Sequence, residues 1–180
     1  MKKHILILIA IAGFAVGASA QTHLKAGLGY YGESIVNPGV VLEFEYEKMQ
    51  SDDFSLPLRV DIGFHSTPDF NAFSIDLHKG FRKSFENGLF IEQSVGIGMI
   101  NKSFKNSNYW FADKYFSVIP HGNKSVWDLM PSVTFGAGYQ LSEAGTLWLR
   151  PKVYWDLGYR GLNIPYTAIQ LGYTHTFKTL

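Results

Sequence analysis

Alternation of apolar and acidic residues over Val40–Glu47 (Val-Val-Leu-Glu-Phe-Glu-Tyr-Glu) constrains the fold of this chain more than any other feature. Every second residue is apolar, and the positions between hold Glu43, Glu45 and Glu47. A period of two residues is the pattern of a β-strand with two unlike faces. In a soluble sheet the glutamates would meet water. In a closed membrane barrel the apolar row meets lipid, and the glutamates point inward, where they need cationic partners.

The same alternation recurs along the chain. It marks eight expected strands, at residues 22–31, 40–47, 58–66, 72–82, 89–100, 127–140, 146–157 and 166–178. Turn signals such as Asn37-Pro38-Gly39, Thr67-Pro68-Asp69 and Glu86-Asn87-Gly88 separate several of them. Eight segments of roughly ten residues are what the smallest membrane barrels require. The pattern therefore predicts an all-β fold, an eight-stranded antiparallel up-and-down transmembrane barrel over residues 21–180, with a long extracellular loop at residues 101–126.

The first twenty residues have the composition of a secretory signal. Lys2 and Lys3 precede an apolar run too short to span a bilayer, and Ala18-Ser19-Ala20 matches an A-x-A cleavage site. Residues 1–20 are thus predicted to be a cleavable signal peptide, with the mature chain beginning at Gln21. The chain has no cysteine, so an exported fold has no disulfides to hold it. Its formal net charge of +1 gives no indication of nucleic-acid binding.

Two observations favour a membrane barrel over a soluble, lipocalin-like one. The polar face of the two strands at 89–100 and 127–140 carries mainly small residues, namely Ser94, Gly96, Gly98, Ser132, Thr134, Gly136 and Gly138. Because the inside of an eight-stranded barrel has little volume, small residues predict that this face is the lumen. The outward aromatic residues fall at two levels, Tyr30, Phe64, Phe73 and Trp155 at one rim and Tyr46, Phe81, Tyr139 and Tyr173 at the other. Two such girdles are typical of membrane interfaces.

The last predicted strand adds a resemblance to a known family. Its segment Gln170-Leu171-Gly172-Tyr173-Thr174-His175-Thr176-Phe177 resembles the carboxy-terminal signal read by the outer-membrane insertion machinery, with Gln170, Gly172, Tyr173 and Phe177 at the matching positions. With the signal peptide and eight strands, the chain resembles the small outer-membrane barrels of the OmpX and OmpA-membrane-domain type. The resemblance implies a location in the bacterial outer membrane. It also implies contact with outer-membrane lipid and lipopolysaccharide, and with the insertion machinery during biogenesis.

Charged residues recur on the predicted inner face. They form an expected lumen charge network of Glu43, Glu45, Glu47, Arg59, Asp61, Asp76, His78, Arg82, Glu92, Arg150 and Lys152, and Lys25 and Asp156 point the same way. Because an unpaired charge in a narrow interior costs several kcal/mol, we expect interlocking salt bridges that plug the lumen. Arg59 and Arg150 are the expected bidentate partners of the glutamates at 43–47. The alternative is a charged constriction in an ion pathway.

Histidine and aspartate residues on the inner face raise the question of catalysis or metal binding. Ser74, Asp76 and His78 lie two residues apart, but same-face neighbours on a strand are about 6.6 Å apart, beyond direct hydrogen-bond reach. A cross-strand pair between Asp61 and His78 is easier to form. Such buried pairs are more often structural, so we predict no catalytic residue, no metal site and no cofactor.

Lipid A-modifying barrels provide the sharpest enzyme alternative. The deacylases among them carry a His-x-Ser on the lipid face near the outer rim. In this chain the outward-facing His175 lies at the opposite end, and His121-Gly122-Asn123-Lys124-Ser125 has a different spacing. The comparison therefore favours a protein that is not an enzyme.

The long connection at 101–126 is rich in aromatic and basic residues. Tyr109, Trp110, Phe111, Lys114, Tyr115 and Phe116 are its expected interaction residues, and Lys102, Lys105 and Lys124 add further positive charge. So many exposed aromatic side chains need cover, either from a hairpin folded over the barrel mouth or from a partner. We therefore predict a structural or interaction role, with this loop as a docking surface for a protein partner. The alternatives are a lipid A-modifying enzyme and a narrow, porin-like pathway for ions or small solutes.

Overall fold

The computed structural model describes residues 21–33, 36–105, 109–112, 118–121, 125–157 and 165–179, with backbone only at 109–112, 118–121 and 178–179. Its elements are β1 (Thr22–Glu33), β2 (Asn37–Ser51), β3 (Phe54–Ser66), β4 (Phe70–Ser84), β5 (Leu89–Phe104), β6 (Tyr109–Ala112), β7 (Val118–His121), β8 (Ser125–Gln140), β9 (Gly145–Trp155) and β10 (Pro165–Thr179). The predicted signal peptide at 1–20 lies outside the described residues. Among those residues no helix is long and apolar enough to cross a membrane.

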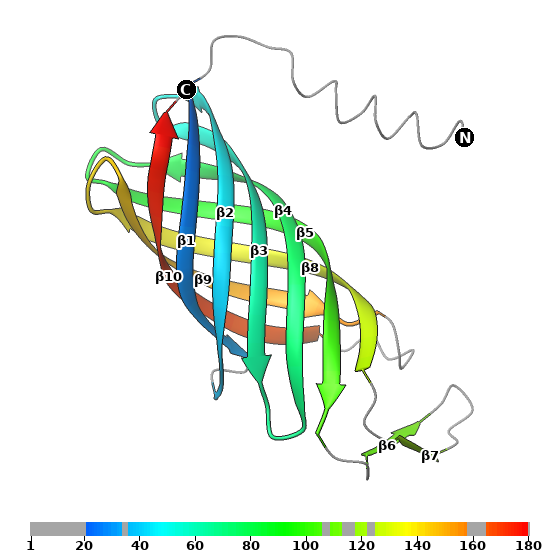
Figure 1. Cartoon of the computed structure of the whole chain (residues 1–180). Coiled ribbons are helices and arrows are strands. Elements are labelled where there is room, and N and C mark those ends of the chain that lie inside the picture. The colour runs from blue at the N-terminus through cyan, green and yellow to red at the C-terminus, as the bar shows by residue number, and fades with distance from the viewer. Residues whose placement is uncertain are drawn as a thin grey trace, which may run out of the picture.

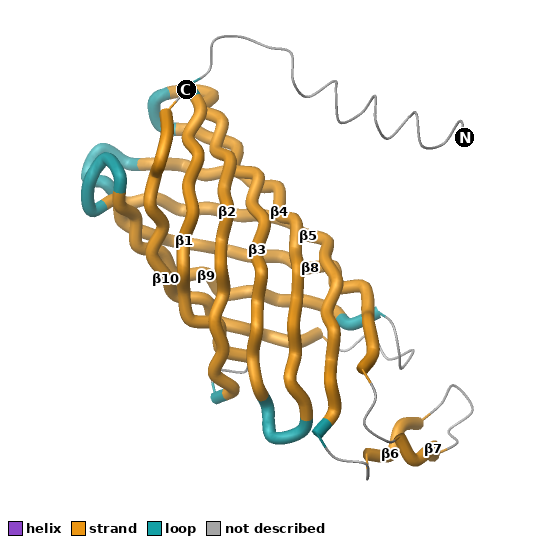
Figure 2. The backbone as a smooth tube through the Cα atoms, in the orientation of Figure 1, coloured by secondary structure: helices purple, strands orange, loops and turns teal. Residues whose placement is uncertain are grey.

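Eight of these strands form one closed antiparallel barrel in the order β1-β10-β9-β8-β5-β4-β3-β2 (Figures 1 and 2). Closure comes from β1, which pairs with β2 on one side and with β10 on the other. The predicted eight-stranded up-and-down barrel is confirmed. Most strands extend beyond their predicted ranges by one to four residues, because the alternation continues through less apolar positions at the rims. The strand expected at 146–157 instead ends at Trp155.

The long connection is shorter than expected, since β5 continues to Phe104 and β8 begins at Ser125. Within it, β6 and β7 pair as a separate two-stranded sheet that is not part of the barrel. Figure 1 shows this hairpin beyond the ends of β5 and β8, at the opposite end of the barrel from the carboxy terminus.

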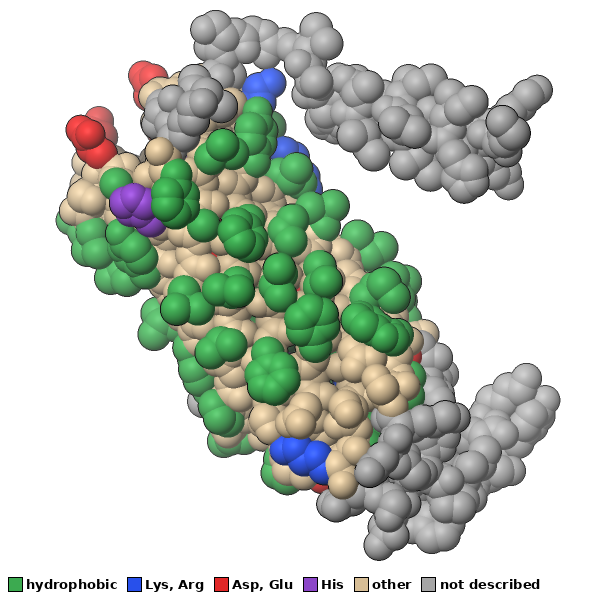
Figure 3. Space-filling model, in the orientation of Figure 1, with side chains coloured by type: hydrophobic (Ala, Val, Ile, Leu, Met, Phe, Trp, Pro, Cys, Tyr) green, Lys and Arg blue, Asp and Glu red, His purple; other side chains and the backbone are tan. Residues whose placement is uncertain are grey.

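Exposed apolar side chains are spread over the outer face of the barrel seen in Figure 3, and further ones project from the remaining strands. One row crosses six strands in register, through Leu28, Leu42, Ile62, Ile75, Met99 and Leu129, and every member except Ile62 is strongly exposed. Of the aromatic residues expected at the two rims, all but the half-buried Trp155 are exposed. Trp127 joins the rim nearer the loop, with its ring centroid 6.3 Å from that of Phe73. A continuous apolar belt of this kind is stable only against lipid.

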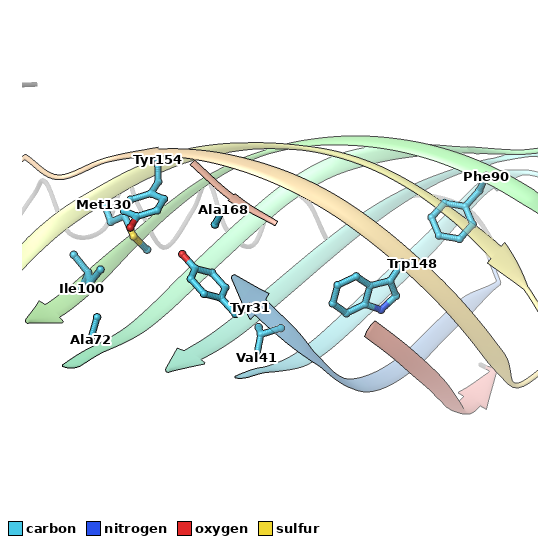
Figure 4. Packing of buried hydrophobic residues seen from close by; sticks show 9 residues of the cluster. All are labelled: Tyr31, Val41, Ala72, Phe90, Ile100, Met130, Trp148, Tyr154 and Ala168. Atoms are coloured by element: carbon cyan, nitrogen blue, oxygen red, sulfur yellow. The ribbon is translucent and has the colours of Figure 1, made fainter. Parts of the chain in front are cut away.

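The inside of the barrel is packed with side chains. Tyr31, Val41, Ala72, Ile100, Met130, Tyr154 and Ala168 lie toward the loop end, and Trp148 and Phe90 lie toward the other end (Figure 4). Inward glycines make room for the large groups. A Cβ at Gly138 would lie 2.2 Å from the Phe90 ring, and one at Gly172 would lie 2.4 Å from the Trp148 ring. The small inward residues therefore accommodate large neighbours in a narrow lumen.

Candidate functional site

The acidic side of the lumen is built by β2. Glu43, Glu45 and Glu47 are almost completely buried, whereas Phe44 and Tyr46 between them are exposed on the outside. The two-residue period of the strand produces this separation, because successive side chains point to opposite faces. Three carboxylates are thereby held in one row inside the barrel, and each needs a cation within reach.

Arg82 on β4 binds two members of this row, Glu45 and Glu47, and connects them to β5. Its two terminal nitrogens donate to the two carboxylate oxygens of Glu45, each at 2.9 Å. The same guanidinium donates to Glu47 at 2.8 Å and to Glu92 at 2.6 and 2.9 Å. The guanidinium carbon also lies 4.6 Å from the centroid of the Phe90 ring. One arginine thus ties together carboxylates from β2 and β5 with strong, charge-assisted hydrogen bonds.

Arg150 on β9 binds carboxylates on β2 and β5. It forms a two-pronged ion pair with Glu43 and a further pair with Glu92, and its guanidinium carbon lies 4.1 Å from the Trp148 ring centroid. Trp148 donates its indole N–H to Thr174 at 2.6 Å, which fixes the ring under the arginine. Only arginine can make this arrangement, because its planar guanidinium stacks on the indole ring and pairs with two carboxylates at once, whereas the ammonium of lysine is a point charge.

Arg59 does not make the bidentate contact predicted for it. It stands directly opposite Glu45 in the β2–β3 register, but its guanidinium lies 3.0 Å from Asp61 and 3.2 Å from Glu92. Its nearest approach to a β2 glutamate is 4.0 Å, to Glu43. Arg82 and Arg150 bind the glutamates of β2 instead, and Arg59 pairs with Asp61 and shares Glu92 with these two arginines.

Lysines complete the pairing at both ends of the network. Lys25 on β1 forms an ion pair with Glu47 and lies 3.5 Å from Glu45. Lys152 donates to Asp76 at 3.0 Å. All eleven predicted network residues therefore point into the lumen and are buried there, and each has an oppositely charged group within 4.0 Å if His78 is counted with Asp61.

The histidine–aspartate cluster divides into separate pairs. His78 lies 3.6 Å from Asp61 on the neighbouring strand, and Asp76 is paired with Lys152 instead of with a histidine. Among the described residues no group of three or more His, Cys, Asp or Glu side chains is placed to hold a metal ion. The cluster belongs to the same ionic interior as the rest of the lumen.

A second set of polar contacts lies nearer the loop end and was not predicted. Tyr154 donates to Glu33 at 2.5 Å, His65 lies 3.5 Å from Glu33, and Lys102 pairs with Asp156. Glu33 and Lys102 lie just past the predicted ends of their strands. The two-residue alternation continues through both positions and could have predicted that their side chains point inward.

A pocket of about 220 Å³ opens at the end of the barrel that carries the termini. Its lining includes His23, Lys25, Glu47, Arg82 and Gln140. Arg82 and Phe90 form its inner end, so the pocket stops where the ionic network begins.

The remaining predicted residues are described only in part. Tyr109, Trp110 and Phe111 form β6, with side chains outside the described set, and Lys114, Tyr115 and Phe116 lie outside the described residues altogether. In the predicted insertion signal, Gln170 is buried in the lumen and Gly172 faces Trp148, whereas Tyr173 and Phe177 are exposed on the outer face. Their role in insertion stays a prediction.

Comparison with known proteins finds similar folds among solved structures but no similar sequence. No family model matches the chain, and a comparison with curated proteins finds no sequence match. Among solved structures it is similar to the N-terminal β-barrel domain of OprF from Pseudomonas aeruginosa, with a TM-score of 0.57 and 16% identity over 88% of this chain and 100% of that one. It is also similar to Ail, the attachment invasion locus protein of Yersinia pestis, with a TM-score of 0.56 and 10% identity over 89% of this chain and 100% of that one. For Neisserial surface protein A, the TM-score is 0.51 and the identity 8%, over 89% and 98%. By its closed barrel and its apolar belt, the chain is an integral outer-membrane β-barrel protein with the architecture of the small OmpX- and OmpA-type barrels.

Proposed function

We propose that this protein is a closed outer-membrane barrel that conducts no ions and exposes the loop at 101–126 as a docking surface. The observation that carries the first half is the arginine network across the lumen. Arg82 and Arg150 project from β4 and β9 and reach carboxylates on β2 and β5. Ion pairs that span the lumen occupy the space through which solutes would pass.

Packing around the network supports closure. Tyr31, Ile100, Met130 and Tyr154, each at most 1% exposed, fill the lumen between the network and the loop end. An eight-stranded barrel has an interior just wide enough for its own side chains. A pore would require several buried ion pairs to separate at once, and separating each pair is strongly unfavourable.

The purified monomer in planar lipid bilayers is therefore expected to show no regular single-channel steps. A known porin reconstituted in the same bilayers is the positive control for detection. Stable, ohmic channels whose number scales with the amount of this protein would contradict the closed lumen and favour the pore alternative.

The docking half rests on the composition and position of the loop. Three aromatic residues belong to β6, which pairs with β7 in a sheet outside the barrel, and the sequence of the same loop contains Lys114 and Lys124. One solved structure of the similar protein Ail is a complex with the heparin analogue sucrose octasulfate, which is a polyanion. Lys114 and Lys124 add positive charge to this loop and favour acidic partners, whereas Lys102 pairs with Asp156 inside the barrel and Lys105 donates to Ser66 and to the carbonyl of Thr67.

Replacing residues 106–124 with an Asn-Gly turn tests this role. Ser103 and Ser125 are directly opposite in the β5–β8 register, so a short turn can close the hairpin without disturbing the barrel. The shortened protein is expected to fold like the wild type but to lose the partner that co-purifies with the wild type from native membranes in mild detergent. Recovery of the same partner with both forms would contradict docking through this loop.

A further inference from the structure

Lys79 places a charged side chain within the apolar belt on the outside of the barrel. It is exposed on β4, between the exposed Leu77 and Phe81 on the same strand. In register it stands opposite Leu58 on β3 and Val95 on β5, which are exposed as well. A cation surrounded by lipid-facing groups is unfavourable unless it reaches an interface or a counter-charge.

Other polar groups lie beside Lys79 on the same outer face. Lys48 follows Tyr46 by two residues on β2 and is opposite Leu56 on β3, two residues from Leu58, which is opposite Lys79. Gln93 on β5 is opposite Phe81 and therefore diagonal to Lys79, within reach of a long side chain. Basic side chains at the edge of this face nearest the carboxy terminus are blue in Figure 3.

An apolar groove adjoins these lysines. It has a volume of about 500 Å³, and its outer-face lining includes Leu24, Phe44, Tyr46, Leu58, Val60 and Phe177. Leu58 is the direct neighbour of Lys79, and Tyr46 is opposite Leu58 in the β2–β3 register. The groove therefore begins where the two lysines lie.

We propose that this face is a binding site for an anionic phospholipid, with the phosphate held between Lys48 and Lys79 and an acyl chain in the groove. Two positive charges beside an apolar groove match an anionic headgroup attached to a hydrocarbon chain. An amide at Gln93 and a tyrosine at the same level add hydrogen-bonding groups suited to a headgroup. The site lies in the half of the barrel that carries the termini. The choice of leaflet rests on the predicted extracellular position of loop 101–126, which turns that half of the barrel toward the inner leaflet, so the ligand is a phospholipid rather than lipid A.

Native mass spectrometry of the whole mature chain in detergent tests this site. The probes are phosphatidylglycerol and phosphatidylcholine with the same acyl chains, and lipid A. The wild type is expected to bind phosphatidylglycerol more tightly than phosphatidylcholine. Lys79→Gln and Lys48→Gln are each expected to weaken phosphatidylglycerol binding about fivefold, with little change for phosphatidylcholine.

Lys105→Gln is the matched control. It removes the same charge at the other end of the barrel, where Lys105 donates to Ser66 and to the carbonyl of Thr67. Phosphatidylglycerol binding should not change in this variant. Equal binding of phosphatidylglycerol by the wild type, Lys48→Gln and Lys79→Gln would overturn the proposed site. Lipid A binding that is at least as tight and equally dependent on Lys79 would overturn the choice of an inner-leaflet phospholipid. If Lys79→Gln does not fold, the result with Lys48→Gln decides alone.

Discussion

Arg82→Met is expected to lower the free energy of unfolding by about 3–5 kcal/mol, the usual loss when one partner of a buried ion pair is removed. Arg82 is the common donor to Glu45, Glu47 and Glu92, so its loss leaves three buried carboxylates with fewer cations. Methionine retains much of the apolar stem and therefore isolates the contribution of the guanidinium. Reversible urea unfolding in lipid vesicles, followed by tryptophan fluorescence, measures the change.

The neighbouring residue is the control for Arg82. Lys83 points to the outside, and both side chains of its ion pair with Asp53 are about half exposed. Lys83→Met is therefore expected to change the unfolding free energy little, because solvent screens an exposed pair.

A double variant tests the network itself. Since Arg82→Met and Glu45→Leu remove the two sides of one interaction, together they should cost less than the sum of the single changes. A loss of less than about 1 kcal/mol for Arg82→Met would mean that the carboxylates are solvated, which would contradict the closed lumen.

Leu42→Arg is expected to cost about 2–4 kcal/mol, because it places a cation on the lipid face at mid-membrane depth. Leu42 is exposed between Leu28 and Ile62, in the aliphatic row that crosses six strands. The same unfolding measurement applies, and the loss should shrink in vesicles with thinner hydrocarbon cores, where the arginine can reach the interface.

The control for Leu42 lies in a turn. Leu141 is equally apolar and exposed but sits in the short connection between β8 and β9, outside the belt. Leu141→Arg should therefore have little effect on stability in the same vesicles. Equal losses at the two positions would argue that the cost arises from folding in general, and not from contact with lipid.

Local pattern alone determined the strands and their faces. Because side chains alternate strictly along a strand, the glutamates at 43–47 had to share a face, and the apolar residues between them had to share the other. The turn at Glu86-Asn87-Gly88 was equally readable, and the structure places Gly88 there with a φ of 82°, a conformation that suits glycine. Eight such strands, with small residues on the polar face, were sufficient to predict the barrel and its inside.

Only the tertiary structure decided which charges meet. Arg59 and Arg150 were the expected partners of the glutamates, and Arg150 does pair with Glu43. Arg59 stands opposite Glu45 in register but does not bind it, and Arg82 from β4 binds Glu45 instead. Which charges pair depends on how the long side chains fill the closed lumen, and the pattern of one strand carries no information about strands that are not its neighbours. The positions of Glu33 and Lys102 depended likewise on how far each strand continues, which is set by pairing with its neighbours. The apolar groove and the lysines beside it became visible only when their strands were placed side by side, because their residues lie on β1, β2, β3, β4 and β10.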